Sequence, residues 1–118
     1  MIPTEIRLRT ASRLLVVRFD DGATFDYPFE YLRVHSPSAE VKGHGPGQGT
    51  LQMGKENVLL TAVEPVGQYA VRLVFDDGHN TGLYTWAYLR ELGEQREDKW
   101  QAYLDRLQAA GYARKKPG

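Results

Sequence analysis

The sequence contains no cysteine among its 118 residues. This absence excludes disulfides, thiolate catalysis, iron–sulfur ligation and zinc sites built on thiolates. The chain also lacks an excess of charge of either sign, because 15 basic side chains balance 15 acidic ones. Proteins that bind nucleic acid usually carry a basic excess or stripe, and the only clear basic run here is at 114–116. We therefore expect no nucleic-acid partner.

Long apolar runs are missing as well. No stretch approaches the roughly 18–20 apolar residues of a membrane helix, and residues 1–5 lack the basic and apolar regions of a signal peptide. We therefore expect a cytoplasmic protein without a membrane partner. The apolar fraction of 42% is nevertheless enough for one buried core. The composition predicts a single domain at 1–112 and a disordered basic tail at 113–118.

Two segments of the chain resemble each other. Both contain Phe-Asp-Asp-Gly, at 19–22 and 75–78, and both continue to Tyr-Leu-Arg, at 31–33 and 88–90. The offsets are 75 − 19 = 56 and 88 − 31 = 57, so one residue was gained or lost between the two landmarks. Each motif follows an alternating strand pattern, and Asp-Gly is typical of a tight turn. Two similar hairpins could arise by chance; we favour a pseudo-duplicated strand–turn–strand–helix unit.

The rest of the chain extends this pattern to an α+β fold of antiparallel β-meanders and hairpins. Alternation at 6–9 predicts a strand that joins the first unit, and 58–64 predicts a strand before the second. Thr85 is a suitable N-cap for a helix at 86–92, which Gly93 would end. A last helix, over 94–110, should pack on the sheet through one apolar stripe made of Trp100, Tyr103, Leu104 and Leu107.

A long segment rich in glycine, 35–49, separates the two units. Loops of this length inside a compact domain are usually functional or disordered. The adjoining residues 49–56 match the phosphate-binding loop pattern except at its last position, where Glu56 replaces the hydroxyl that holds Mg²⁺. A strand also follows in place of a helix, so we expect no nucleotide site. We find no complete catalytic constellation in the sequence and predict that the chain is not an enzyme.

The three histidines are the remaining candidates for chemistry. His35, His44 and His79, with Glu40, could form a metal site with nitrogen and oxygen ligands if the fold brings 35–44 next to residue 79. For each histidine taken alone, a polar loop residue is the alternative.

These residues resemble the gamma-butyrobetaine hydroxylase-like N-terminal domain family. The resemblance lies in the Phe-Asp-Asp-Gly-His block at 75–79 with Tyr84 and Trp86 beyond it, and in the Leu-Arg-x-x-Ser-Pro-Ser-Ala-Glu-Val block at 32–41. It covers most of 4–107. In that family the domain forms the N-terminal part of iron/2-oxoglutarate hydroxylases, is fused to ATPases of iron–sulfur cluster assembly, or stands alone in bacteria. The resemblance implies a bacterial protein of the free-standing kind.

The resemblance also implies where a structural zinc of the hydroxylases would fall, namely on Ser36, Ser38, Val41 and His79. Serine hydroxyls are poor zinc ligands and valine is none, so the resemblance implies a degenerate site. It places His79 beside the 36–44 loop, where we expect hydrogen bonds to replace the metal.

The resulting prediction is a non-catalytic interaction or accessory domain, associated with iron–sulfur assembly or oxygenase proteins, whose protein partner is not identified. The predicted interaction surface comprises Ser36, Ser38, Gly43, Gly45, Gln48, Trp86 and Tyr88. The alternative is a metal- or small-ligand-binding protein that uses His35, His44 and His79.

Overall fold

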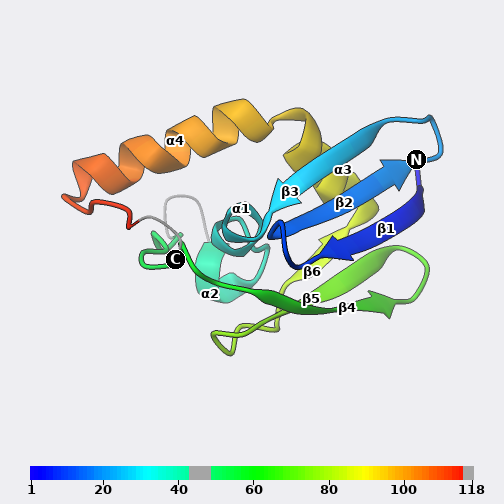
Figure 1. Cartoon of the computed structure of the whole chain (residues 1–118), viewed down its shortest axis with the longest axis horizontal. Coiled ribbons are helices and arrows are strands. Elements are labelled where there is room, and N and C mark those ends of the chain that lie inside the picture. The colour runs from blue at the N-terminus through cyan, green and yellow to red at the C-terminus, as the bar shows by residue number, and fades with distance from the viewer. Residues whose placement is uncertain (43–48, 116–118) are drawn as a thin grey trace.

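Two three-stranded antiparallel sheets and four helices make up the domain (Figure 1). The computed structural model describes residues 1–42 and 49–115. The first sheet has the order β1-β2-β3 and the second the order β4-β5-β6. The strands are β1 (Pro3–Arg9), β2 (Leu14–Phe19), β3 (Thr24–Pro28), β4 (Leu60–Val66), β5 (Ala70–Phe75) and β6 (Leu83–Thr85). The helices are α1 (Phe29–Val34), α2 (Ala39–Lys42), α3 (Trp86–Glu94) and α4 (Arg96–Ala109).

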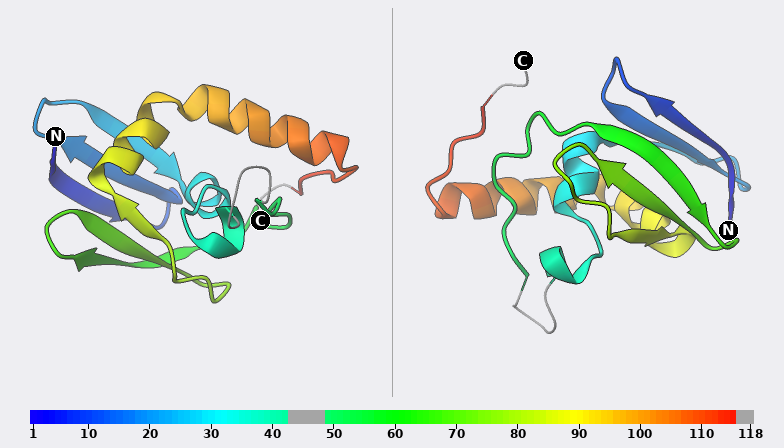
Figure 2. Two further views of the ribbon diagram at one scale, coloured as in Figure 1. Left: turned by 180° about the vertical axis from the view of Figure 1, so that it is seen from behind. Right: turned by 90° about the horizontal axis from the view of Figure 1, so that it is seen from below.

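This arrangement confirms the predicted α+β fold with C-terminal helices packed on the sheet. Helix α3 contacts β3 and β6, and Figure 2 shows α4 continuing from α3 past α1 toward the end of the molecule that carries α2. Within the described residues, none of the helices is long and apolar enough to cross a membrane.

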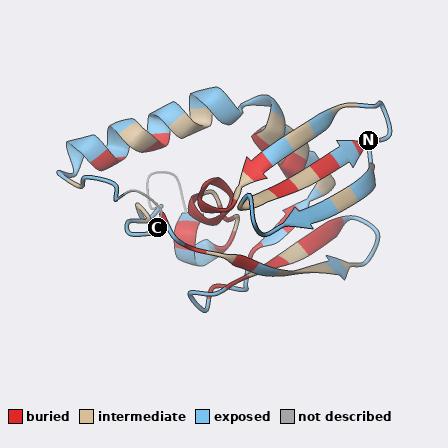
Figure 3. Ribbon diagram, viewed as in Figure 1, coloured by how far each residue is buried: buried red, intermediate tan, exposed pale blue. Residues whose placement is uncertain are grey.

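The main core lies between the two sheets and the helices that follow them (Figure 3). Alternate residues of β2 and β5 point into it, because a strand turns successive side chains to opposite faces. The inward residues are Leu15, Val17 and Phe19 from β2 and Val71, Leu73 and Phe75 from β5, all at most 2% exposed. A second cluster joins Val34 of α1 to Tyr103 and Leu107 of α4. The apolar stripe predicted for the last helix therefore faces the body of the domain.

The duplication is longer than the sequence motifs indicate. Strands β1 and β4 both have seven residues and begin 60 − 3 = 57 residues apart, and α1 and α3 begin 86 − 29 = 57 apart. The pairing of the first two strands is irregular at the same place in both sheets, before Glu5 and before Ala62. Thr4 and Thr61 are the only identical residues at equivalent positions of β1 and β4. With so little identity, the sequence did not reveal that these strands belong to the repeat.

The turns after β2 and β5 are equivalent as well. The N–H of Phe19 donates to the carbonyl of Ala23 at 2.8 Å, and the N–H of Phe75 donates to that of His79 at 3.0 Å. Gly22 and Gly78 both have φ of 88°, a left-handed conformation that glycine adopts without strain. The predicted Asp-Gly turns are therefore present in both copies.

Buried tyrosines connect the two copies in a reciprocal way. The hydroxyl of Tyr27 donates to the carbonyl of Leu89 at 2.7 Å, and that of Tyr84 donates to the carbonyl of Leu32 at 2.6 Å. Because 84 − 27 and 89 − 32 are both 57, the two hydrogen bonds join equivalent positions, one from the first copy to the second and one from the second to the first.

A second tyrosine pair follows the same rule. Tyr31 donates to the carbonyl of Leu92, and Tyr88 donates to that of His35, both at 2.6 Å. The offsets 88 − 31 and 92 − 35 are again 57. Each helix thus receives two phenol hydroxyls from the other copy at carbonyls in or just after its last turns.

Helix α3 differs from the prediction at its end. Thr85 caps its start as expected, accepting a hydrogen bond from the N–H of Tyr88 at 3.1 Å. The helix does not stop at Gly93, however, but runs on to Glu94. Gly93 lies against the ring of Phe25, and a Cβ built on it would come within 2.5 Å of Phe25 Cγ. Glycine is needed here for this close approach and not for helix termination.

The chain after α4 turns back onto the domain. Both the Tyr112 hydroxyl and the Lys115 N–H donate to Glu56 Oε2 at 2.7 Å, and the Arg114 guanidinium forms an ion pair with Glu30. Of the predicted tail 113–118, Arg114 and Lys115 therefore contact the body, and 116–118 lie outside the described residues.

The reciprocal tyrosine bonds predict the effect of removing a single oxygen. Tyr27→Phe and Tyr84→Phe should each lower the free energy of unfolding by about 1–3 kcal/mol, because a buried carbonyl loses its donor. Tyr69→Phe is the matched control, since Tyr69 is 55% exposed. Urea unfolding at neutral pH measures all three. Equal stability of the two core variants and the control would contradict the assigned role.

Candidate functional site

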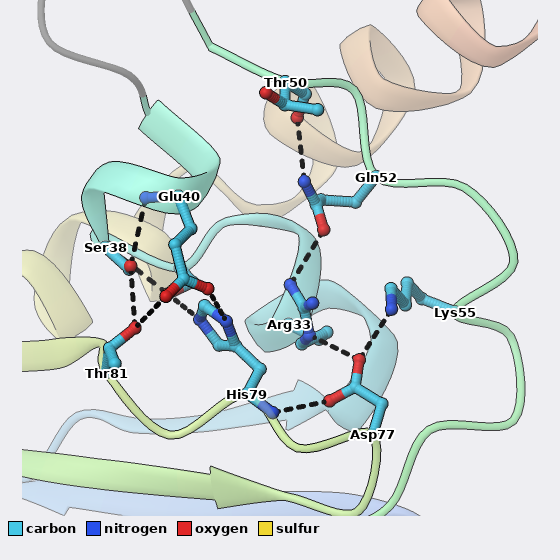
Figure 4. Close-up of polar contacts among 10 residues, drawn as sticks. Arg33, Ser38, Glu40, Thr50, Gln52, Lys55, Asp77, His79 and Thr81 are labelled. Carbon is cyan, nitrogen blue, oxygen red and sulfur yellow. Dashed lines mark hydrogen bonds and ion pairs between the residues drawn. The ribbon is translucent and has the colours of Figure 1, made fainter.

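At His79 the two copies differ in chemistry. Its counterpart in the first copy is Ala23, since 79 − 23 equals the offset of 56 between the two turns. The His79 ring is buried, and its Nε2 lies 2.8 Å from Ser36 Oγ. Its Nδ1 lies 3.3 Å from Glu40 Oε2 (Figure 4). The second turn is thereby tied to the segment that follows α1.

The Ser-Pro-Ser segment at 36–38 supplies most partners of this network. Ser38 Oγ lies 2.8 Å from Thr81 Oγ1 and accepts a hydrogen bond from the N–H of Glu40 at 3.2 Å. Ser36 Oγ accepts in the same way from the N–H of Ser38 at 3.3 Å. Serine side chains that accept from a following backbone N–H are typical of helix starts. The two hydroxyls therefore start the short helix α2 and bind it to the loop before β6.

An ion-pair network adjoins His79. Asp77 Oδ2 accepts from Arg33 Nε at 2.8 Å and from Lys55 Nζ at 2.6 Å, and Arg33 also donates to Gln52 Oε1 at 3.0 Å (Figure 4). Burial opposes ionisation of Asp77, but the hydrogen bonds from Lys55, the His79 N–H and Arg33 outweigh it and lower the pKa of this carboxyl. The side chain stays charged and joins α1, the 52–55 segment and the second turn.

A matching ion pair joins the two copies in the opposite direction, from an arginine of the second copy to an aspartate of the first. Arg90 NH2 lies 2.9 Å from Asp21 Oδ2, and the offsets 90 − 33 = 57 and 77 − 21 = 56 are those of the repeat. The sequence offered a signal here, because both arginines belong to the Tyr-Leu-Arg motif and both aspartates to Phe-Asp-Asp-Gly. The arginine of each Tyr-Leu-Arg motif pairs with an aspartate in the Phe-Asp-Asp-Gly motif of the other copy.

Ser36, His79 and Glu40 have the connectivity of a hydrolase triad, but the serine cannot act as a nucleophile in this fold. Ser36 is 0% exposed. A Cβ on Gly82 would lie 2.4 Å from Ser36 Oγ, so the backbone of Gly82 covers that atom. An attacking hydroxyl needs room for a substrate carbonyl and for donors that stabilise an oxyanion. The arrangement is a structural hydrogen-bond network.

The same residues do not fit the structural zinc of the hydroxylases. Val41 offers a buried apolar side chain, and the remaining donors are two hydroxyls and one imidazole. Ser36 Oγ and His79 Nε2 hydrogen-bond directly at 2.8 Å, whereas a tetrahedral ion with ligand bonds of about 2.0–2.2 Å would hold them roughly 3.3–3.6 Å apart. The donor set suits hydrogen bonds between the 36–40 segment and the loop before β6.

His35 lies in a different environment from His79. Its Nδ1 is 2.9 Å from the carbonyl of Tyr31, and its ring makes a tilted contact with the ring of Tyr31 and an edge-on contact with that of Tyr103. Within residues 1–42 and 49–115, no group of three or more histidine, aspartate or glutamate side chains could hold a metal ion. His44 lies outside the described residues, so the predicted site with Glu40 stays a prediction.

The predicted interaction surface is divided by the structure. Gly43, Gly45 and Gln48 lie outside the described residues. Ser36 and Ser38 are buried and hydrogen-bonded, so they position α2 and present no side chain to a partner. Trp86 donates from Nε1 to the carbonyl of Gln68 at 2.8 Å. Tyr88 belongs to the 35–42 region, because its hydroxyl bonds to His35 and Lys42 Nζ lies 4.3 Å from its ring centre.

Beside His35 lies a pocket of about 300 Å³ that sequence reasoning missed. Its wall comes from the ends of α1 and α2, the 49–52 segment, α3 and α4. We call it the basic pocket, after the three cations among its lining residues, Lys42, Lys99 and Arg106. These cations come from distant parts of the chain and share no motif, so nothing in the sequence indicates that they line one pocket.

The fold and the site together define a duplicated α+β domain with an internal hydrogen-bond network beside an open basic pocket. A sequence model of the family described as gamma-butyrobetaine hydroxylase-like, N-terminal, matches residues 6–90. The chain belongs to this family, which confirms the resemblance.

Solved structures of similar chains agree. Two proteins studied by NMR in solution are 51% and 48% identical to this chain and cover 99% of it, with TM-scores of 0.83 and 0.84. The alignments span 91% and 87% of those proteins. A crystal structure from Acidithiobacillus ferrooxidans ATCC 23270, a protein of unknown function of the DUF971 family, is 46% identical over 77% of this chain and 91% of its own, with a TM-score of 0.66. No curated protein matches the sequence.

The buried histidines predict how stability depends on pH. Burial lowers the pKa of His79 and of His35 in the folded chain, so the unfolded chain binds more protons below its ordinary histidine pKa of about 6.5. Stability should be complete above that pH and fall as the pH drops toward 5.5. His79→Gln should lower the free energy of unfolding at pH 7.5 by about 1–3 kcal/mol and lose less on acidification than the wild type. Urea unfolding at both pH values checks this, and an unchanged pH dependence would refute it.

Proposed function

We propose that this chain is a non-catalytic binding module that holds a protein partner on the face around the basic pocket. The family resemblance favours partners from iron–sulfur assembly or oxygenase systems. The observation that carries the proposal is the contrast between the His79 network, which is satisfied internally, and the pocket beside it, where Lys42 and Arg106 are exposed.

The non-catalytic part of the proposal rests on burial. The hydroxyl of Ser36 and the imidazole of His79 are enclosed and bonded to each other. Asp77 is held by two cations, Arg33 and Lys55. A catalytic acid, base or nucleophile must reach a bound substrate. These groups instead hold the segments that shape the neighbouring face.

The face around the basic pocket is proposed because its base is held rigidly and several of its side chains are exposed. The network fixes α2 and the 49–52 segment against the domain, and Tyr88 and Tyr103 are anchored by hydroxyl bonds to the carbonyls of His35 and Gln52. Lys42, Thr50 and Arg106 are exposed around this fixed base. A preorganised surface loses little entropy when a partner binds, which favours affinity.

Site-directed photo-crosslinking tests this assignment. A photoreactive phenylalanine analogue at Ala39 or at Thr50, both exposed, should capture a defined partner in cells. The matched control is Thr24, exposed at the start of β3, which Figure 1 and Figure 2 place at the far end of the domain from α2. The captured protein is then purified and titrated calorimetrically against the whole chain. Equal capture at Thr24, or no binding by the purified partner, would refute the proposed face.

A further inference from the structure

The basic pocket carries more positive charge than its surroundings neutralise. Its lining includes three cations and a single carboxylate, Glu91. That carboxylate is already engaged, since Glu91 Oε2 lies 3.4 Å from Lys99 Nζ. Lys42 and Arg106 have no ion-pair partner within the described ranges 1–42 and 49–115. The pocket therefore offers two uncompensated cations, one on α2 and one on α4.

The three cations share one pocket. Lys42, Lys99 and Arg106 all line it, together with His35. Their charges also reach the His35 ring, because burial and then Lys99, Arg106 and Lys42 lower the pKa of that imidazole. The three charges therefore lie around a single space.

The walls between the cations are aromatic. Tyr88 and Tyr103 both line the pocket, and both use their hydroxyls in hydrogen bonds to backbone carbonyls. Lys42 Nζ stays 4.3 Å from the centre of the Tyr88 ring. Such a cation–π contact holds a lysine near a surface without neutralising its charge. A ligand would thus meet tyrosine rings fixed by their hydroxyl bonds and the exposed positive charges of Lys42 and Arg106.

We propose that the basic pocket binds an acidic segment of the partner protein, with one or two carboxylate side chains entering it. This inference rests on the proposed binding function and names the chemistry of the partner. The volume of about 300 Å³ is at the lower limit of ordinary ligand pockets, which suits one or two residues of a peptide. Lys42 and Arg106 are exposed at the rim, so a carboxylate can reach them while it remains attached to a chain.

An NMR titration of the isotopically labelled full chain tests the inference. The probe is an octapeptide of alternating Asp and Glu, and its Asn/Gln counterpart is the uncharged control. We expect saturable shifts confined to amides of 34–36, 49–52, 88–91 and 99–106 with the acidic probe, and none with the control. Lys42→Gln and Arg106→Gln should each weaken binding by about twofold to fivefold, the usual effect of losing one exposed charge pair.

The matched control variant is Arg7→Gln. Arg7 is an exposed cation on β1 that pairs with Glu5 at 3.8 Å, outside the pocket. This variant should bind the acidic probe as the wild type does. Equal weakening by Arg7→Gln would mean that the acidic peptide is attracted by the overall positive charge and not by the pocket, which would overturn the inference. Undiminished binding of the peptide by the Lys42/Arg106 double variant would overturn it as well. The spectrum of each free variant shows that it is folded.

A last titration tests whether the pocket binds a peptide or a small free anion. Succinate is titrated at the same total carboxylate concentration. If succinate gives the same shifts and displaces the octapeptide with equal or higher affinity, the pocket takes a small free dicarboxylate and the acidic-segment proposal is wrong. If a partner captured from Ala39 still binds the Lys42/Arg106 double variant fully, the acidic-segment proposal fails while the proposed function stands.

Discussion

The hydrogen bonds from tyrosine hydroxyls of one copy to helix carbonyls of the other are the interaction on which the rest of the structure depends. Tyr27 and Tyr84 form one reciprocal pair, and Tyr31 and Tyr88 the other. A phenol hydroxyl enclosed in a core must find an acceptor, so each ring fixes the position of the opposite helix as well as filling space. The first copy, from the start of β1 at Pro3 to the end of α1 at Val34, is shorter than the roughly 40 residues that a chain usually needs to support a core of its own. Each copy therefore supplies the acceptors and the apolar face that the other lacks.

Function is expected where this symmetry is broken. The first copy continues from α1 into the 35–42 segment, and the second continues from α3 into α4, so the two ends meet on one side of the domain (Figure 2). His79 stands where the first copy has Ala23, and it bonds to Ser36 of that segment. The basic pocket lies beside this junction. Symmetric bonds thus build the scaffold, and the unequal continuations of the copies build the surface.

Local chemistry explains which features could be predicted from the sequence. Strand alternation, the two Asp-Gly turns, the Thr85 cap and the apolar stripe of α4 each depend on residues close together in the chain. The prediction that Gly93 ends the helix was wrong, because this glycine is needed for close contact with Phe25, which is distant in sequence. The repeated motifs show that two similar units exist, but they do not show that residues of one unit bond to residues of the other. The tyrosine bonds and the Arg33–Asp77 ion pair were therefore not predicted. For the site, the resemblance implied that His79 lies beside the 36–44 loop, and its contacts with Ser36 and Glu40 agree with this for the described part of that loop. The meeting of Lys42, Lys99 and Arg106 at one pocket depends on tertiary packing alone.

Native-state hydrogen exchange tests the central claim, which is that the two copies are interlocked and form one cooperative unit. Exchange of the β2 and β5 amides is followed at increasing urea concentrations below the unfolding transition, together with global unfolding. Interlocked copies predict that the slowest amides of both strands exchange with the same free energy, equal to that of global unfolding. Exchange of one sheet through an opening of clearly lower free energy, while the other stays protected, would contradict the account.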